Sequence, residues 1–183
     1  MSIVVREQKK RIHPHKFTLW VALASITMMF AGFTSAYIIK RNQVNWVSFN
    51  LPAIFWYSTA VIIASSVTIH LAQNAFRVRD MMKFRGLVVA TLILGILFIT
   101  FQFIGFQQLW ANGMTLTANV SFSFLYVIIG LHALHIIGGI IAAKAFSAKV
   151  RNYDIVPVEV ISTYWHFVDF LWIYLLIFLI LIR

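Results

Sequence analysis

Long stretches without any charged residue divide the chain into segments of membrane-spanning length. A helix needs about 20 apolar residues to cross a hydrocarbon layer about 30 Å thick. Residues 17–39 and 42–76 contain no Lys, Arg, Asp or Glu, and residues 86–143 form a still longer run of the same kind. That longest run exceeds one span, and the polar stretch 107–113 is its most plausible turn. We therefore predict an all-α integral membrane protein with five transmembrane helices, at 17–39, 52–76, 86–106, 119–143 and 157–182.

The basic residues predict how these five helices are oriented. Twelve of the fifteen Lys and Arg lie on the side of the N-terminus, in the basic tail at residues 1–16 and in the second and fourth connections. Only Lys40, Arg41 and Arg183 lie on the other side. Since inner loops are enriched in Lys and Arg, we expect a cytoplasmic N-terminus and a periplasmic C-terminus. Residues 17–183 then form a single transmembrane domain in the bacterial cytoplasmic (inner) membrane, and the tail is not a cleaved signal peptide.

Composition agrees with a membrane protein and disfavours several other classes. Hydrophobic residues make up 61% of the chain and charged residues 11%, whereas soluble domains carry roughly 25% charged residues. The net charge of +10 follows from membrane topology, so no nucleic-acid partner is predicted. The absence of cysteine excludes disulfides, thiolate metal sites and thiol nucleophiles.

Ionisable residues inside predicted spans are the main candidates for function, because each is costly in a bilayer unless it faces protein. They fall on one stripe of the fourth helix and one stripe of the fifth, at similar predicted depths: His132, His135, Glu159, His166 and Asp169. We interpret them as an internal polar network between two helices. A proton or ion path and a metal or haem site are the less favoured alternatives, and the absence of any ExxH unit weighs against a di-iron site.

Other residues have simpler interpretations. Small residues that let helices approach closely predict packing positions at Gly32, Gly95, Gly138 and Gly139. A stripe of Thr91, Gly95, Gln102 and Gly105 predicts a packing seam, and His70 with Thr59 and Ser66 predicts a helix contact or a snorkelling side chain. Four basic loop residues could contact lipid headgroups: Arg77, Arg79, Lys149 and Arg151.

Two motifs in the last helices resemble subunit III of haem-copper terminal oxidases. The run Tyr164-Trp165-His166-Phe167-Val168-Asp169, with Glu159 before it and Trp172 after it, is similar to that family's final-helix signature. The run Gly130-Leu131-His132-Ala133-Leu134-His135 is similar to its penultimate-helix pattern. Weaker similarity continues through Phe30–Tyr37 and Leu94–Gln102, and five spans match the shorter members.

The resemblance implies a non-catalytic subunit of a respiratory oxidase of the cytochrome c oxidase type, which reduces O2 to water and translocates protons. No cofactor is then expected in this chain, while haem and copper belong to partner subunits and a phospholipid is bound. The implied partners are the catalytic subunit I, a copper-binding or quinol-type subunit II, a small subunit IV and a quinol-oxidising complex in a supercomplex. Ile26 stands where the family usually carries a buried glutamate, so no proton relay through that position is expected.

Three alternatives stay open at this stage. The chain could be subunit III of a quinol oxidase, because the electron donor binds other chains. It could be a stand-alone membrane haem or metal protein that uses His132, His135 and His166. It could also be a small transporter or scaffold.

Overall fold

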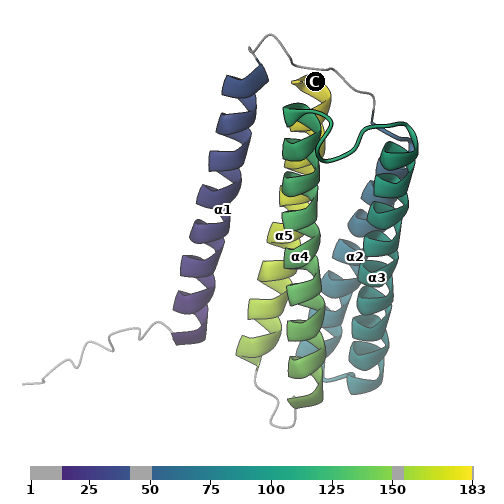
Figure 1. The fold of residues 1–183 in the computed structure, drawn as a ribbon. Coiled ribbons are helices and arrows are strands. Elements are labelled where there is room, and N and C mark those ends of the chain that lie inside the picture. Colours follow the sequence, from purple (N-terminus) through teal and green to yellow (C-terminus); the bar gives the residue numbers. More distant parts are fainter. Residues whose placement is uncertain (1–13, 42–50, 150–154, 183) are drawn as a thin grey trace, which may run out of the picture.

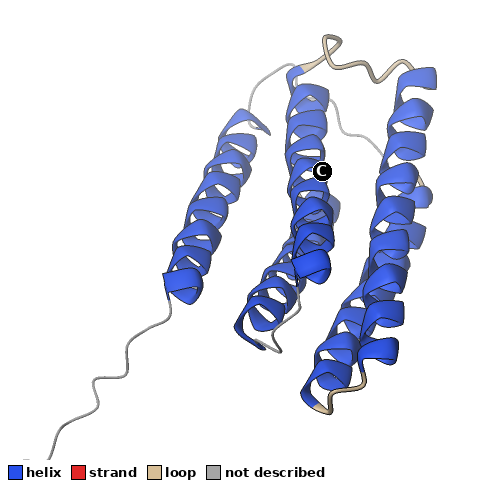
Figure 2. Ribbon diagram, turned by 90° about the horizontal axis from the view of Figure 1, so that it is seen from below, coloured by secondary structure: helices blue, strands red, loops and turns tan. Residues whose placement is uncertain are grey.

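A computed structural model describes residues 14–41, 51–149 and 155–182 of the chain, without the side chains of 146–149. In these ranges the protein consists of five long helices and no strand, as predicted (Figures 1 and 2). Each is long and apolar enough to cross a membrane. The helices are α1 (Pro14–Arg41), α2 (Ile54–Arg77), α3 (Met81–Ala111), α4 (Val120–Lys149) and α5 (Ile155–Leu181).

Most helices extend beyond the apolar runs that predicted them. Helix α3 begins at Met81 rather than at residue 86, and α4 continues to Lys149 rather than ending at residue 143. The apolar run marks only the hydrocarbon layer, whereas the backbone hydrogen bonds of a helix continue through the polar interface on either side. Helix α2 is the exception, because it begins at Ile54, two residues after Pro52.

The connection between α2 and α3 is consequently much shorter than predicted. Only three residues separate Arg77 from Met81, and Arg79 adopts a φ of 60°, a left-handed conformation uncommon for a residue other than glycine. Asp80 caps α3 by accepting a hydrogen bond from the backbone N–H of Lys83 at 3.1 Å, which holds the pKa of the Asp80 carboxyl below its usual value. The turn therefore clamps α2 and α3 into a tight antiparallel pair.

Four of the helices form a closed ring, and α1 lies outside it. Helix α2 packs on α3 and α5, and α4 packs on the same two helices from the other side. Among the described helices, α1 contacts α4 and α5 alone, and Figure 1 shows it beside that pair and away from α2 and α3. The start of α1, the α2–α3 turn and the start of α5 lie at one end of the bundle, which we call the basic end.

The centre of the ring is an aromatic cluster to which each of its four helices contributes one ring. Trp172 of α5 lies 5.0 Å from Phe98 of α3, 6.2 Å from Phe55 of α2 and 5.2 Å from His132 of α4, measured between ring centroids. All four side chains are at most 1% exposed. The imidazole of His132 is therefore part of the close-packed core of the bundle.

The predicted glycine positions differ in their surroundings. A Cβ atom added at Gly95 would lie 3.1 Å from the Trp165 ring of α5 and 3.2 Å from Ile140 of α4, and one at Gly139 would lie 3.0 Å from the Tyr164 ring, so side chains of other helices fill the space beside both glycines. A Cβ atom at Gly32 or Gly138 would meet nothing within 4 Å. Within the described chain, Gly32 and Gly138 are thus not contact points between helices. Of the predicted stripe on α3, Thr91, Gln102 and Gly105 face α2, where they lie against Thr68, Ser58 and Phe55, whereas Gly95 faces α4 and α5.

Substitution of the two adjacent glycines of α4 by valine tests this packing. Gly139→Val should lower the stability of the folded chain by about 1–3 kcal/mol, the usual cost of overpacking, because the new methyl groups collide with Tyr164. Gly138→Val is the matched control and should leave stability nearly unchanged. Heat denaturation in detergent, monitored by protease resistance, measures the stability of both variants. Equal losses at the two positions would contradict the assigned contact.

Candidate functional site: a polar seam between α2 and α5

Hydrogen-bonding side chains line the contact between the antiparallel helices α2 and α5. We call this contact the α2–α5 seam. Its observed pairs, from the basic end inward, are Arg77–Glu159 (3.5 Å), Gln73–Ser162 (3.0 Å), Ser66–His166 (2.6 Å), Ser65–Trp165 (3.1 Å) and Thr59–Trp172 (2.9 Å). Because lipid offers no hydrogen bonds, polar side chains at this depth are stable only when they face protein.

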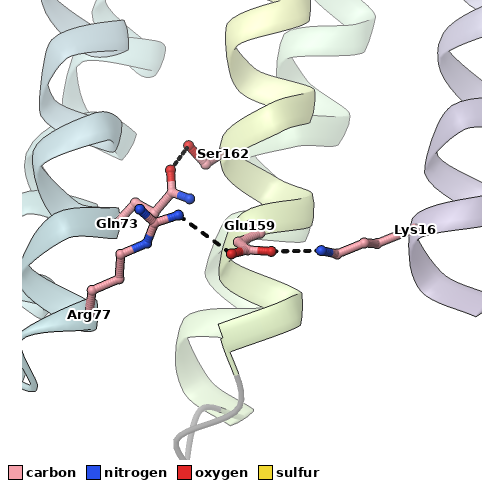
Figure 3. Close-up of polar contacts among 5 residues, drawn as sticks. All are labelled: Lys16, Gln73, Arg77, Glu159 and Ser162. Atoms are coloured by element: carbon pink, nitrogen blue, oxygen red, sulfur yellow. Dashed lines mark hydrogen bonds and ion pairs between the residues drawn. The ribbon is translucent and has the colours of Figure 1, made fainter. Parts of the chain in front are cut away.

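The outermost part of the seam is an ionic group that also holds α1. The Glu159 carboxylate lies 2.8 Å from the Lys16 ammonium of α1 and 3.5 Å from the Arg77 guanidinium of α2 (Figure 3). Helices α1 and α2 do not pack on each other, so Glu159 is the group through which they interact. A single carboxylate thus offsets two cations at a strongly basic end of the protein.

The next part of the seam contains two imidazoles. The rings of His70 and His166 lie 6.1 Å apart, and Nδ1 of His166 lies 2.6 Å from the Ser66 hydroxyl. His70 is exposed on the surface of α2, whereas His166 is partly buried. The predicted helix contact at Thr59 and Ser66 is therefore observed, and His70 lies at its exposed edge.

Asp169 lies one turn deeper than His166 and is 4% exposed. Neither of its carboxyl oxygens has a hydrogen-bond partner among the described residues. Asp169 is thus a buried acidic side chain whose hydrogen-bonding capacity is not used within the described chain.

The two histidines of α4 lie apart from this seam. Both ring nitrogens of His132 are buried and have no hydrogen-bond partner among the described residues, and the ring lies against Trp172, Phe98 and Phe30. Nδ1 of His135 lies 2.7 Å from the carbonyl oxygen of Leu131 in its own helix. Of the five residues predicted to form one network, only Glu159, His166 and Asp169 lie on the seam, and no two of the five share a hydrogen bond in the described chain.

This arrangement does not resemble a built metal site. In the described residues, no group of three or more His, Asp or Glu side chains is placed to hold a metal ion. Aromatic rings surround the His132 nitrogens and occupy the space that ligands or a macrocycle would need. What the seam can do chemically is hold helices together and exchange protons among imidazole, hydroxyl and carboxyl groups.

Gln73, Lys16 and Ser65 of the seam were missed in the sequence, and one signal could have found Gln73. Thr59, Ser66 and Gln73 recur at intervals of seven on α2, which places them on one face of the helix. The partners Lys16 and Ser65 carried no such signal, because helical periodicity gives a face but does not identify the neighbouring helix.

The four predicted headgroup contacts have different outcomes. Arg77 pairs with Glu159, and Arg79 lies in the α2–α3 turn. The Lys149 side chain and Arg151 lie outside the described residues, as does the tail at residues 1–13.

Open grooves border α1 where it meets α5, and two of them differ in the character of their walls. One has a volume of about 280 Å³ and is lined by Lys16, Trp20, Gln73, Glu159 and Thr163 among others. The second, of about 200 Å³, lies further from the basic end between Phe30 of α1 and Phe167 and Tyr174 of α5. The first combines charged and apolar walls, and the second is almost entirely apolar.

Comparison with known proteins gives consistent matches along the whole bundle. The family model described as cytochrome c oxidase subunit III matches residues 15–182. A probable cytochrome c oxidase subunit 3 of Nocardia farcinica is 32% identical over 162 residues, covering 82% of this chain and 79% of the relative. The probable cytochrome c oxidase subunit 3 of Mycobacterium leprae is also 32% identical, with 84% and 80% covered. A cytochrome bo(3) ubiquinol oxidase subunit 3 of Buchnera aphidicola is 26% identical over 170 residues, with 86% and 81% covered.

A double-mutant cycle on the ionic group tests its role in holding α1. Lys16→Gln and Glu159→Gln should each lower the free energy of unfolding by up to about 1 kcal/mol, because the Lys16 side chain is 43% exposed and its ion pair is screened. The two effects should be less than additive, because both substitutions remove the same interaction. Raised salt should reduce the coupling.

Lys83→Gln is the control, because it removes one positive charge at the same end without touching α1; Lys83 pairs with Asp80 in its own turn. Thermal unfolding of the four proteins and the control gives the coupling energy. Strict additivity of Lys16→Gln and Glu159→Gln would contradict the assigned interaction.

Proposed function

The chain belongs to the cytochrome c oxidase subunit III family, and we propose that it acts in a respiratory oxidase as a non-catalytic subunit that stabilises the catalytic subunit. The proposal rests on the family match over residues 15–182. It is supported by buried polar side chains that hydrogen-bond between helices. In this proposal the chain holds no redox centre of its own. Haem and copper are bound by partner subunits, where O2 is reduced to water.

A quinol oxidase is the second candidate complex. The relatives described as cytochrome c oxidase subunits are up to 32% identical, and the ubiquinol oxidase subunit of Buchnera is 26% identical. The higher identity favours the cytochrome c oxidase type. In either case the proposed partners are the catalytic subunit I and a subunit II that receives electrons, with a subunit IV and a quinol-oxidising complex as wider associates.

We also propose that a phospholipid lies against α1 and α5. The groove of about 280 Å³ near Lys16 and Trp20 offers a cation and an indole at the basic end, and the apolar groove at Phe30 and Phe167 continues the same helix contact further inward. A headgroup phosphate near Lys16 with acyl chains along α1 fits this order of polar and apolar walls.

The proposed location is the bacterial cytoplasmic membrane, with the basic end facing the cytoplasm. Lys16, Arg77, Lys83 and Arg85 all belong to this end of the described bundle, and inner surfaces of membrane proteins carry such an excess of cations.

Purification through a tag on this chain tests the proposed role. The complex from native membranes should contain a haem-copper subunit and consume O2 with reduced cytochrome c, whereas the chain separated from its partners should show no Soret band and no stoichiometric metal. A Soret band in the separated chain would favour a haem protein in its own right. Oxidation of a quinol instead of cytochrome c would select the second candidate, and recovery without any haem-copper subunit would contradict the proposal.

Substitution of His166 tests whether the seam serves assembly. His166→Ala removes the partner of Ser66 and should reduce the amount of this chain retained in the purified complex several-fold, the equivalent of about 1 kcal/mol for one hydrogen bond. Electron transfer per intact complex should change less. The measurement is subunit stoichiometry and turnover on the same preparation, and equal losses of both per assembled complex would contradict an assembly role.

A further inference from the structure

The Asp169 carboxyl is buried, and no hydrogen bond in the described chain stabilises it. Its side chain is 4% exposed and lies ten residues beyond Glu159, about 15 Å deeper along α5. A carboxylate buried without a hydrogen bond or a cation is much less stable than the neutral acid, because it has lost its hydration and gained nothing in return. Lys16 and Arg77, the cations of the seam, are already engaged by Glu159 at the basic end. The Asp169 side chain is therefore most stable with a proton bound to its carboxyl group.

A line of polar groups leads from the surface of the bundle to this carboxyl. His70 is exposed on α2, seven residues and about 10 Å from Arg77. Its ring lies 6.1 Å from that of His166, a separation that one water molecule can bridge. His166 and Ser66 are in direct hydrogen-bond contact at 2.6 Å. Asp169 follows His166 by three residues, so its side chain lies one turn deeper on the same face of α5.

The other titratable side chains of the neighbouring helices do not provide a comparable route. His132 of α4 faces aromatic rings and has no hydrogen bond in the described chain. Helix α1 brings only Lys16 to the seam, at the basic end, and the basic side chains of α3 lie in its first turns. Access to Asp169 is thus from the side of α2.

We propose that Asp169 is a proton-binding site of this chain, loaded from the basic end through His70, His166 and Ser66. In the loading step, His166 takes up a proton at Nε2 from the His70 side and gives its Nδ1 proton to the Ser66 oxygen. Ser66 passes its own hydroxyl proton to a carboxylate oxygen of Asp169. The net change is one proton bound by the carboxylate, with Ser66 restored and His166 in its other tautomer.

Infrared spectroscopy of the intact complex tests the bound proton. At neutral pH the wild-type complex should show a C=O stretching band of a protonated carboxyl that Asp169→Asn removes, Asp169→Glu shifts and D2O displaces to lower frequency. Asp80→Asn is the control, because Asp80 caps α3 at the surface with an ionised carboxylate. The proposal is overturned if the spectrum of Asp169→Asn differs from wild type only in the carboxylate region. If the Asp169→Asn complex does not assemble, Asp169→Glu is compared with wild type instead: a shifted C=O band supports the proposal, and an unshifted band overturns it.

The route is tested by the rate at which this band shifts after transfer to D2O. Ser66→Ala and His70→Ala leave Asp169 in place and should slow the shift by about tenfold or more, the ratio expected when one hydrogen-bonded transfer step is lost. Ser25→Ala is the matched control, since Ser25 is an exposed hydroxyl bonded only to the backbone of α1. An unchanged rate in both Ser66→Ala and His70→Ala overturns the proposed route. This outcome is separate from the proposed role in the oxidase, because it is read from the carboxyl and not from turnover.

Discussion

The constraint that governs this protein is that polar groups within a membrane find their partners inside the protein. Backbone groups meet it by forming helices, and most hydroxyls inside the spans do so by bonding to a carbonyl oxygen one turn earlier, as Thr91 and Thr34 do. Larger polar side chains require another helix. The α2–α5 seam is where that requirement is met most fully, and it fixes the register of two helices that are far apart in the sequence.

The rest of the bundle is arranged around this seam. Trp172 bonds to Thr59 at its inner end and at the same time contacts the rings of Phe98 and His132, so one side chain joins the seam to α3 and α4. At the other end, Glu159 extends the seam to α1. Between these points lie hydrogen-bonded pairs and the Asp169 carboxyl, which has no hydrogen-bond partner among the described residues. The α2–α5 seam therefore contains both the pairs that hold helices together and the proposed proton-binding site.

The sequence predicted the number and approximate position of the helices because the thickness of the hydrocarbon layer sets the length of a spanning helix. Runs of that length without charged residues can be found from the sequence alone. It also placed His166 and Asp169 on one stripe, since the period of a helix is fixed. It could not predict that His132 joins an aromatic core while His166 joins α2, because periodicity does not specify which helix a stripe faces. The short α2–α3 turn was missed for a related reason: Lys83 and Arg85 end the apolar run but do not end the helix.

The position of α1 has a consequence for biosynthesis. Of the five helices, α1 leaves the ribosome before the others, yet within the described bundle it contacts only α4 and α5, which follow α2 and α3 in the chain. Its apolar sequence is sufficient for insertion, but its final place cannot be occupied until the C-terminal helix has been translated. The contacts of α1 thus have the largest separation in sequence that this chain allows, and such contacts form late. Docking of α1 would therefore show a quality-control system in the membrane that all five helices have been made.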